Sequence, residues 1–173
     1  MAPYAIRKVG DPVLRRRAAD VTDIDGALKR LTDDMAVTMY DAPGVGLAAP
    51  QVGSDLRLAV VDPTVGEDPS QVRILINPEI TRREGLETDV EGCLSLPGIN
   101  DKVDRPFAIT VRAQDLRGEG FEIEAEEYLA RVICHEVDHL DGILFTDHLR
   151  GLRKERARRQ LKKLAEETQG VMA

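Results

Sequence analysis

Two histidines and a glutamate are spaced in a way that suits metal chemistry. His135 and His139 lie four residues apart in a His-Glu-x-x-His run, with Glu136 directly after the first histidine. On a helix both imidazoles would lie on one face, one turn apart, and could reach a single metal ion. Glu136 would then be placed to take a proton from water at that ion. An ordinary amphipathic helix is the alternative, but two of only three histidines form this pattern, which favours a metal site.

A catalytic site of this kind commonly uses three protein ligands. One large peptidase group supplies the third from a histidine six residues after the second, but Phe145 holds that position here. Glu155 and Glu166 are downstream candidates without a supporting pattern, and we interpret His148 as a surface residue. Upstream, Cys93 follows a predicted strand in a glycine-flanked turn, and a thiolate is a strong ligand for borderline and soft metals.

Three helices are predicted. The helix that carries the histidines runs from about 126 to 140 and ends near a glycine at 142. Another covers about 25–40, where Asp25 caps the start and apolar residues recur at helical spacing. A charged helix over about 152–168 has a narrow apolar stripe formed by Leu152, Leu161 and Leu164.

Short β-branched runs predict strands between these helices. Two of them are expected to pair across a polar loop at 64–70, and the last two are joined by a turn at 116–120. The strands are expected at 57–61, 72–77, 87–90, 107–112 and 121–124.

Two further segments are predicted to lack regular structure. The glycine-rich stretch 44–53 has neither the spacing nor the lysine of a phosphate loop. We interpret it either as a connector or as a loop that lets a ligand approach the backbone closely. The leader at 4–23 is expected to be polar and irregular, with a solvated basic run at 15–17.

Length and composition indicate one globular domain of 173 residues with 42% hydrophobic side chains. No apolar run approaches the roughly 20 residues of a membrane helix, and residues 1–18 lack the apolar core of a signal peptide. A cytoplasmic protein without a membrane partner is predicted. The net charge of −7 argues against general nucleic-acid binding.

The charge is unevenly distributed along the chain. Residues 150–173 contain eight Lys or Arg and three Glu, a local balance of +5 that leaves −12 elsewhere. This basic segment is either a solvated helix face or a surface for an acidic partner such as RNA.

The remaining nucleophiles are interpreted as structural. Cys134 precedes His135 but points to another side of the predicted helix, which favours core packing. Ser95 has no free histidine and acid pair to activate it.

Three stretches together resemble the signature motifs of the peptide deformylases. They are residues 44–51, 91–95 and 135–139, in the family's order and with similar separations. Residues 10–15 are also similar to the family's N-terminal stretch, and the likeness covers about 4–149. It implies an α+β fold in which antiparallel or mixed sheets surround the motif helix. We therefore expect a catalytic domain at 1–149 and a basic C-terminal helix at 150–173, packed on that domain or extending from it.

The resemblance also implies the chemistry. The metal would be bound by Cys93, His135 and His139, with Fe(II) as the usual ion and Zn, Ni or Co able to substitute. Spacing alone would have predicted zinc. The implied reaction is hydrolysis of the N-formyl group from the initiator methionine of new polypeptides, which releases formate.

Further residues take roles from the same resemblance. Glu136 would act as base and then as acid. The side-chain amide of Gln51 and the backbone N–H of Leu94 would stabilise the growing negative charge on the formyl oxygen. Gly46 would meet the substrate backbone, and Val45 beside it is also expected to bind substrate.

The chain departs from the family around the substrate pocket. Tyr128 and Arg131 stand where aliphatic residues often line the methionine pocket, and both are predicted to contact substrate. Cys134 replaces a common glutamine before the first motif histidine. Asn100 lies near the position of an arginine that many bacterial members place after the cysteine motif.

Some alternatives stay open. Glu91 and Asp138 could orient a histidine or pair with Arg105. Otherwise Glu91 would only stabilise a turn, and Asp138 would only be a solvated surface residue. A His-Glu-x-x-His endopeptidase and a binding module with a structural metal are the rival functions. As some bacterial deformylases dock on the ribosome through a C-terminal helix, the basic segment is a candidate contact for rRNA phosphates.

Overall fold

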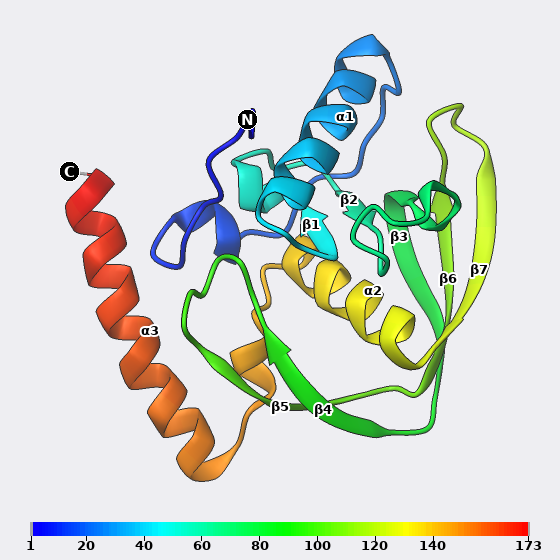
Figure 1. Ribbon diagram of the computed structural model, residues 1–173. Coiled ribbons are helices and arrows are strands. Elements are labelled where there is room, and N and C mark those ends of the chain that lie inside the picture. Colours follow the sequence, from blue (N-terminus) through cyan, green and yellow to red (C-terminus); the bar gives the residue numbers. More distant parts are fainter. Residues whose placement is uncertain (1, 173) are drawn as a thin grey trace.

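The protein consists of two antiparallel sheets around one central helix, α2 (Glu127–Leu140), in a computed structural model that describes residues 2–172. Figure 1 shows α2 in the middle of the molecule, with strands of both sheets around it. The larger sheet has the order β1-β2-β3-β6-β7, and β4 and β5 form a separate hairpin. The predicted α+β class is confirmed. The strands are β1 (Gly46–Ala48), β2 (Leu58–Val61), β3 (Arg73–Glu84), β4 (Glu87–Gly92), β5 (Asn100–Arg105), β6 (Ala108–Gln114) and β7 (Gly120–Glu126).

Helix α2 forms part of the main hydrophobic core. It packs on the sheet residues Val61, Leu75 and Val111, and its own contribution includes Ile133 and Cys134. Cys134 is only 4% exposed, so its interpretation as a core residue is confirmed. Because its apolar faces are held in this way, the remaining face presents its polar side chains in a fixed direction.

Helix α1 (Gly26–Asp41) begins as predicted at Asp25, whose carboxylate accepts a hydrogen bond from the Leu28 N–H at 2.9 Å. Met35 and Met39 are fully buried in a second core cluster between α1 and the β1–β2 end of the sheet. The methionines are therefore packing residues.

Two strands were missed by the sequence prediction. The stretch at 44–53 contains β1 and a 3-10 turn, η2 (Ala49–Val52), and the pairing of β1 with β2 determines that conformation. All three β1 residues are buried, which only small or apolar side chains permit. Strand β5 was missed because its buried positions alternate with charged ones, and its inner face includes Arg105.

The leader is also more ordered than predicted. Asp11 caps a 3-10 turn, η1 (Pro12–Arg15), by accepting from the Val13 N–H at 3.0 Å. Val9, Val13 and Leu14 are buried, whereas the basic run at 15–17 is exposed as expected.

The C-terminal helix α3 (Gly151–Met172) follows a short turn, η4 (Phe145–His148), and packs on the domain through Ala157, Leu161 and Leu164. The predicted place of Leu152 in this stripe is wrong, because Leu152 is 89% exposed. It precedes Leu161 by nine residues, or two and a half helical turns, so the two side chains point to opposite sides of the helix.

The division into a domain at 1–149 and a helix at 150–173 stays a prediction, and its outermost residues, Met1 and Ala173, lie outside the described range. Within residues 2–172, no helix is long and apolar enough to span a bilayer.

Candidate metal centre and active site

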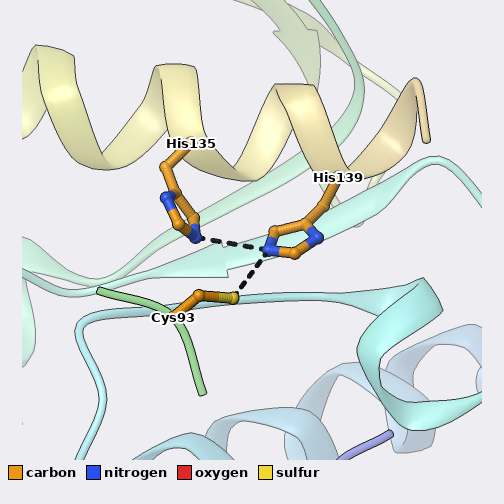
Figure 2. A group of neighbouring side chains, drawn as sticks. All are labelled: Cys93, His135 and His139. Atoms are coloured by element: carbon orange, nitrogen blue, oxygen red, sulfur yellow. Dashed lines mark hydrogen bonds between the residues drawn. The ribbon is translucent and has the colours of Figure 1, made fainter. Parts of the chain in front are cut away.

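The side chains of Cys93, His135 and His139 meet at one point. Their donor atoms lie within 4.8 Å of one another. The two Nε2 atoms are 3.2 Å apart, and Cys93 Sγ is 3.3 Å from His139 Nε2. Figure 2 shows both rings pointing from α2 toward the sulfur. The fold therefore brings the predicted ligands together, although the cysteine lies far from both histidines in the chain.

Local structure explains this convergence. The histidines are four residues apart on α2, so their rings project from adjacent turns of one face. Cys93 directly follows β4, where its carbonyl accepts from the Leu96 N–H at 3.0 Å and the chain turns. The alternative ligands Glu155 and Glu166 lie on α3, and neither belongs to this cluster.

The three donors fit a divalent metal. Tetrahedral coordination with metal–nitrogen distances near 2.0–2.1 Å and a metal–sulfur distance near 2.3 Å gives donor separations of about 3.3 to 3.6 Å. The observed 3.2 and 3.3 Å are close to these values. Two imidazole nitrogens and a sulfur this close to one another need a proton or a cation between them, and a metal ion would serve all three at once. The donor set, a thiolate with two imidazoles, suits zinc, iron, cobalt or nickel.

Glu91 orients the first histidine. Its Oε1 accepts from His135 Nδ1 at 2.8 Å, which leaves Nε2 free to serve as a ligand. Arg105 donates to both carboxylate oxygens, at 2.8 and 3.0 Å. Burial alone would raise the pKa of Glu91, but the hydrogen bonds from His135 and Arg105 outweigh it and lower that pKa to about 2. Glu91 therefore has the geometry of a residue that orients a histidine, and its role is not limited to stabilising a turn.

Asp138 pairs with Arg105, which is the second role that the sequence analysis considered. Its Oδ2 accepts from Arg105 at 2.6 Å, so Arg105 links β5 to α2. His148 is exposed, as predicted, and its Nε2 lies 2.7 Å from the same oxygen. Asp138 thus joins an ion-paired network that includes Glu91 and Arg105.

Glu136 is a buried carboxylate beside the cluster. Its side chain is almost fully enclosed, and Oε2 has no hydrogen-bond partner among the described residues. Burial raises the pKa of Glu136 to about 7, which suits a group that accepts and releases a proton near neutral pH. A Cβ added at Gly46 would lie 2.5 Å from Glu136 Oε1. Glycine at position 46 therefore leaves the space that this carboxylate occupies.

Gln51 is fixed next to the sulfur. Its Oε1 accepts from the Ala48 N–H at 3.0 Å, and its Nε2 donates to Ser95 Oγ at 3.1 Å and lies 3.8 Å from Cys93 Sγ. Ser95 is fully buried and holds this amide, in agreement with its structural interpretation.

The leader forms hydrogen bonds to the segments that carry Gln51 and Ser95, which the sequence analysis did not predict. The Arg7 N–H donates to the Gln51 carbonyl at 2.7 Å, and the Val9 N–H to the Ser95 carbonyl at 2.9 Å. Lys8 Nζ donates to the Leu94 carbonyl at 2.8 Å. No local pattern signals these contacts, because each joins residues that are distant in the chain.

A pocket of about 390 Å³ opens onto the cluster. Of the predicted metal ligands, Cys93 and His135 line it, whereas His139 lies deeper and is only 1% exposed. All the other predicted site residues line it as well: Val45, Gly46, Gln51, Leu94, Tyr128, Arg131 and Glu136.

This fold and site define a class of protein: an α+β protein with a candidate mononuclear metal centre of one cysteine and two histidines. The family model described as polypeptide deformylase matches residues 3–155. A peptide deformylase of Acidobacterium capsulatum is 48% identical over 92% of this chain and 94% of its own length. The peptide deformylase 1 of Clostridium acetobutylicum is 52% identical over 86% of this chain and 96% of its own.

Solved structures agree with these relatives. The peptide deformylase of Thermus thermophilus superposes with a TM-score of 0.87 at 47% identity, covering 95% of this chain and 99% of its own. That of Legionella pneumophila gives a TM-score of 0.86 at 44% identity, with 92% and 94% covered. The chain belongs to the polypeptide deformylase family.

The two cysteines give a direct test of the ligand set. We expect Cys93→Ala to lose the bound metal, because two imidazoles alone leave an incomplete site. Cys134→Ala should keep the full metal content, because that thiol packs in the core. Metal analysis of both purified variants measures the difference. Full metal content in Cys93→Ala would exclude Cys93 as a ligand.

Proposed function

We propose that this site is the one with which the chain, a peptide deformylase, removes the N-formyl group from the N-terminal formylmethionine of newly made polypeptides. One observation carries the assignment: a buried carboxylate with a free oxygen, Glu136, shares a single pocket with the Cys93, His135 and His139 cluster. The overall reaction adds water across the formyl C–N bond and releases formate and a free amine.

Glu136 moves the proton in this reaction. As water attacks the formyl carbon, the carboxylate accepts a proton from it. When the C–N bond breaks, the same group delivers that proton to the departing amine. Burial raises the pKa of Glu136 above its ordinary value, which favours a carboxyl group that can hold the proton between the two transfers.

Two donors stabilise the transition state. Negative charge grows on the formyl oxygen during attack and requires donors that are already in place. The Gln51 amide is held by Ala48 and Ser95 beside the cluster, and the Leu94 backbone belongs to the loop that Lys8 braces. Donors held in this way need no reorganisation as the charge develops.

Cys93, His135 and His139 would hold the metal. When bound, a divalent ion there would supply Lewis-acid chemistry toward water and the formyl oxygen. We propose Fe(II) as the physiological ion, with Zn(II), Ni(II) or Co(II) as substitutes. The soft thiolate and the two imidazoles are compatible with each of these ions, and the family resemblance favours iron.

The pocket is proposed to receive the methionine side chain. Val45, Tyr128 and Val132 present apolar surface to it, and Gly46 lets the substrate backbone approach. Tyr128 is 49% exposed and stands at the entrance. An unbranched thioether side chain suits such a partly apolar space.

Two finer proposals concern where the enzyme works. We place it in the cytoplasm, where nascent chains emerge and where a free thiol such as Cys93 stays reduced.

We also propose that α3 contacts the ribosome. Its packed face is apolar, and Arg159, Lys162 and Lys163 point away from that face into solvent.

Replacing the proposed proton carrier tests the reaction. We expect Glu136→Gln to lower kcat for a formylmethionyl peptide by about 10²- to 10⁴-fold, with the metal content unchanged. Glu122→Gln, an exposed glutamate on β7, should match the parent protein. Formate release measures turnover, and mass spectrometry reports any internal cleavage. Cleavage of internal peptide bonds without formate release would favour the endopeptidase alternative.

The oxyanion role of Gln51 has its own signature. Loss of one such donor costs about 2.7 to 4 kcal/mol, so Gln51→Glu should lower kcat by about 10²- to 10³-fold with little change in KM. The glutamate keeps an oxygen that can accept from the Ala48 N–H but lacks the amide donor. Gln160→Ala on α3 is the control. Unchanged kcat in Gln51→Glu would remove this residue from the mechanism.

Charge reversal on α3 tests the ribosome proposal. The triple variant Arg159→Glu, Lys162→Glu, Lys163→Glu leaves the packed residues intact, so formate release should be unchanged. Its cosedimentation with ribosomes should fall, because contacts with rRNA phosphates depend on positive charge. Reversing Arg82 and Arg83 on β3 gives the control. Equal cosedimentation of both variants and the parent would contradict the proposal.

A further inference from the structure

The position of Cys93 depends on a hairpin that is weakly supported by its own structure. Strands β4 and β5 pair only with each other, separate from the five-stranded sheet. A two-stranded hairpin alone is marginally stable in water. Cys93 follows the last residue of β4, whereas both histidine ligands lie on α2. The contacts that tie this hairpin to α2 therefore contribute directly to the geometry between the two halves of the metal site.

Arg131 makes this connection alongside the pairing of Arg105 on β5 with Asp138 on α2. Arg131 lies on α2 one turn before His135, and its side chain is only 8% exposed. The guanidinium donates to Glu91 Oε2 at 2.8 Å and to the Glu87 carbonyl at 2.8 Å, both on β4. It also donates to the Val103 carbonyl on β5 at 2.9 Å. One side chain of the helix thus holds both strands of the hairpin.

The chemistry of these contacts requires arginine. A guanidinium presents five N–H donors in a flat fork, which can reach acceptors on two strands at the same time. A lysine ammonium is a compact point charge and cannot span them. The contact with Glu91 also restrains the carboxylate that orients His135, from the oxygen opposite to the one that the histidine uses.

The same contacts determine which part of the Arg131 side chain faces the pocket. Arg131 lines the pocket, yet its guanidinium is directed to the hairpin and faces the charge of Glu91. The part of the side chain left to the pocket is its methylene stem. The positive charge of Arg131 can therefore lie next to the pocket that is proposed to receive the methionine side chain.

We infer that Arg131 is a positioning residue of the metal centre. It ties the β4–β5 hairpin to α2 and restrains Glu91, and so holds Cys93 and His135 in the arrangement that binds the ion. This inference rests on the proposed function only for the identity of the site, and it assigns Arg131 no contact with the reacting atoms.

Cobalt(II) provides a readout that is independent of turnover. The apo forms of the parent protein, Arg131→Met, Arg131→Lys and the exposed control Arg82→Met are loaded with Co(II). The thiolate-to-cobalt charge-transfer absorption reports the Cys93 bond, and its decay in excess chelator gives the rate of metal loss. We expect Arg131→Met to show a weakened band and about 10- to 100-fold faster loss. Arg131→Lys should be intermediate and Arg82→Met unchanged.

Thermal unfolding of the apo proteins separates positioning from general stability. If Arg131→Met unfolds at a lower temperature but keeps the parent band and the parent rate of cobalt loss, the inference is wrong. If Arg131→Met does not fold, the Arg131→Lys comparison decides by the same two measurements. A parent protein that holds cobalt through Cys93 yet releases no formate from a formylmethionyl peptide would overturn the proposed function and leave the role of Arg131 standing.

Discussion

A buried carboxylate, Glu91, joins the β4–β5 hairpin to helix α2 beside the candidate metal centre, and its hydrogen bonds are the constraint on which the arrangement depends. It accepts from the His135 ring and from the guanidinium groups of Arg105 and Arg131. Removing such a charge from water costs several kcal/mol, which only close partners of opposite charge can offset. The network meets this condition, because Arg105 and Arg131 are balanced by Glu91 and Asp138.

This network lets one helix serve two purposes. The apolar faces of α2 complete the core against the five-stranded sheet, while its histidine face is directed to the β4–β5 hairpin. The hairpin contacts α2 through buried ion-paired side chains such as Glu91 and Arg105, whereas the larger sheet contacts α2 through apolar side chains. The candidate active site therefore lies where the hydrophobic packing of one sheet ends and the ion-paired packing of the other begins.

The predictable parts of the fold are those that local patterns determine. The helical spacing of His135 and His139 and the capping residue Asp25 located α2 and α1 correctly. Strands β1 and β5 escaped prediction because their conformation comes from pairing with distant partners, and β5 has a charged inner face. Leu152 was misplaced by counting apolar residues without their angular positions. The bracing of Leu94 by Lys8 depends on tertiary structure alone.

X-ray absorption spectroscopy of protein purified without oxygen tests the central claim most directly. We predict one sulfur at about 2.3 Å and two imidazole nitrogens at about 2.0 to 2.1 Å from a single first-row metal ion. Such a shell requires Cys93 to reach both histidines of α2, as the structure places them. A metal shell without sulfur, or a disulfide between Cys93 and Cys134, would contradict the account.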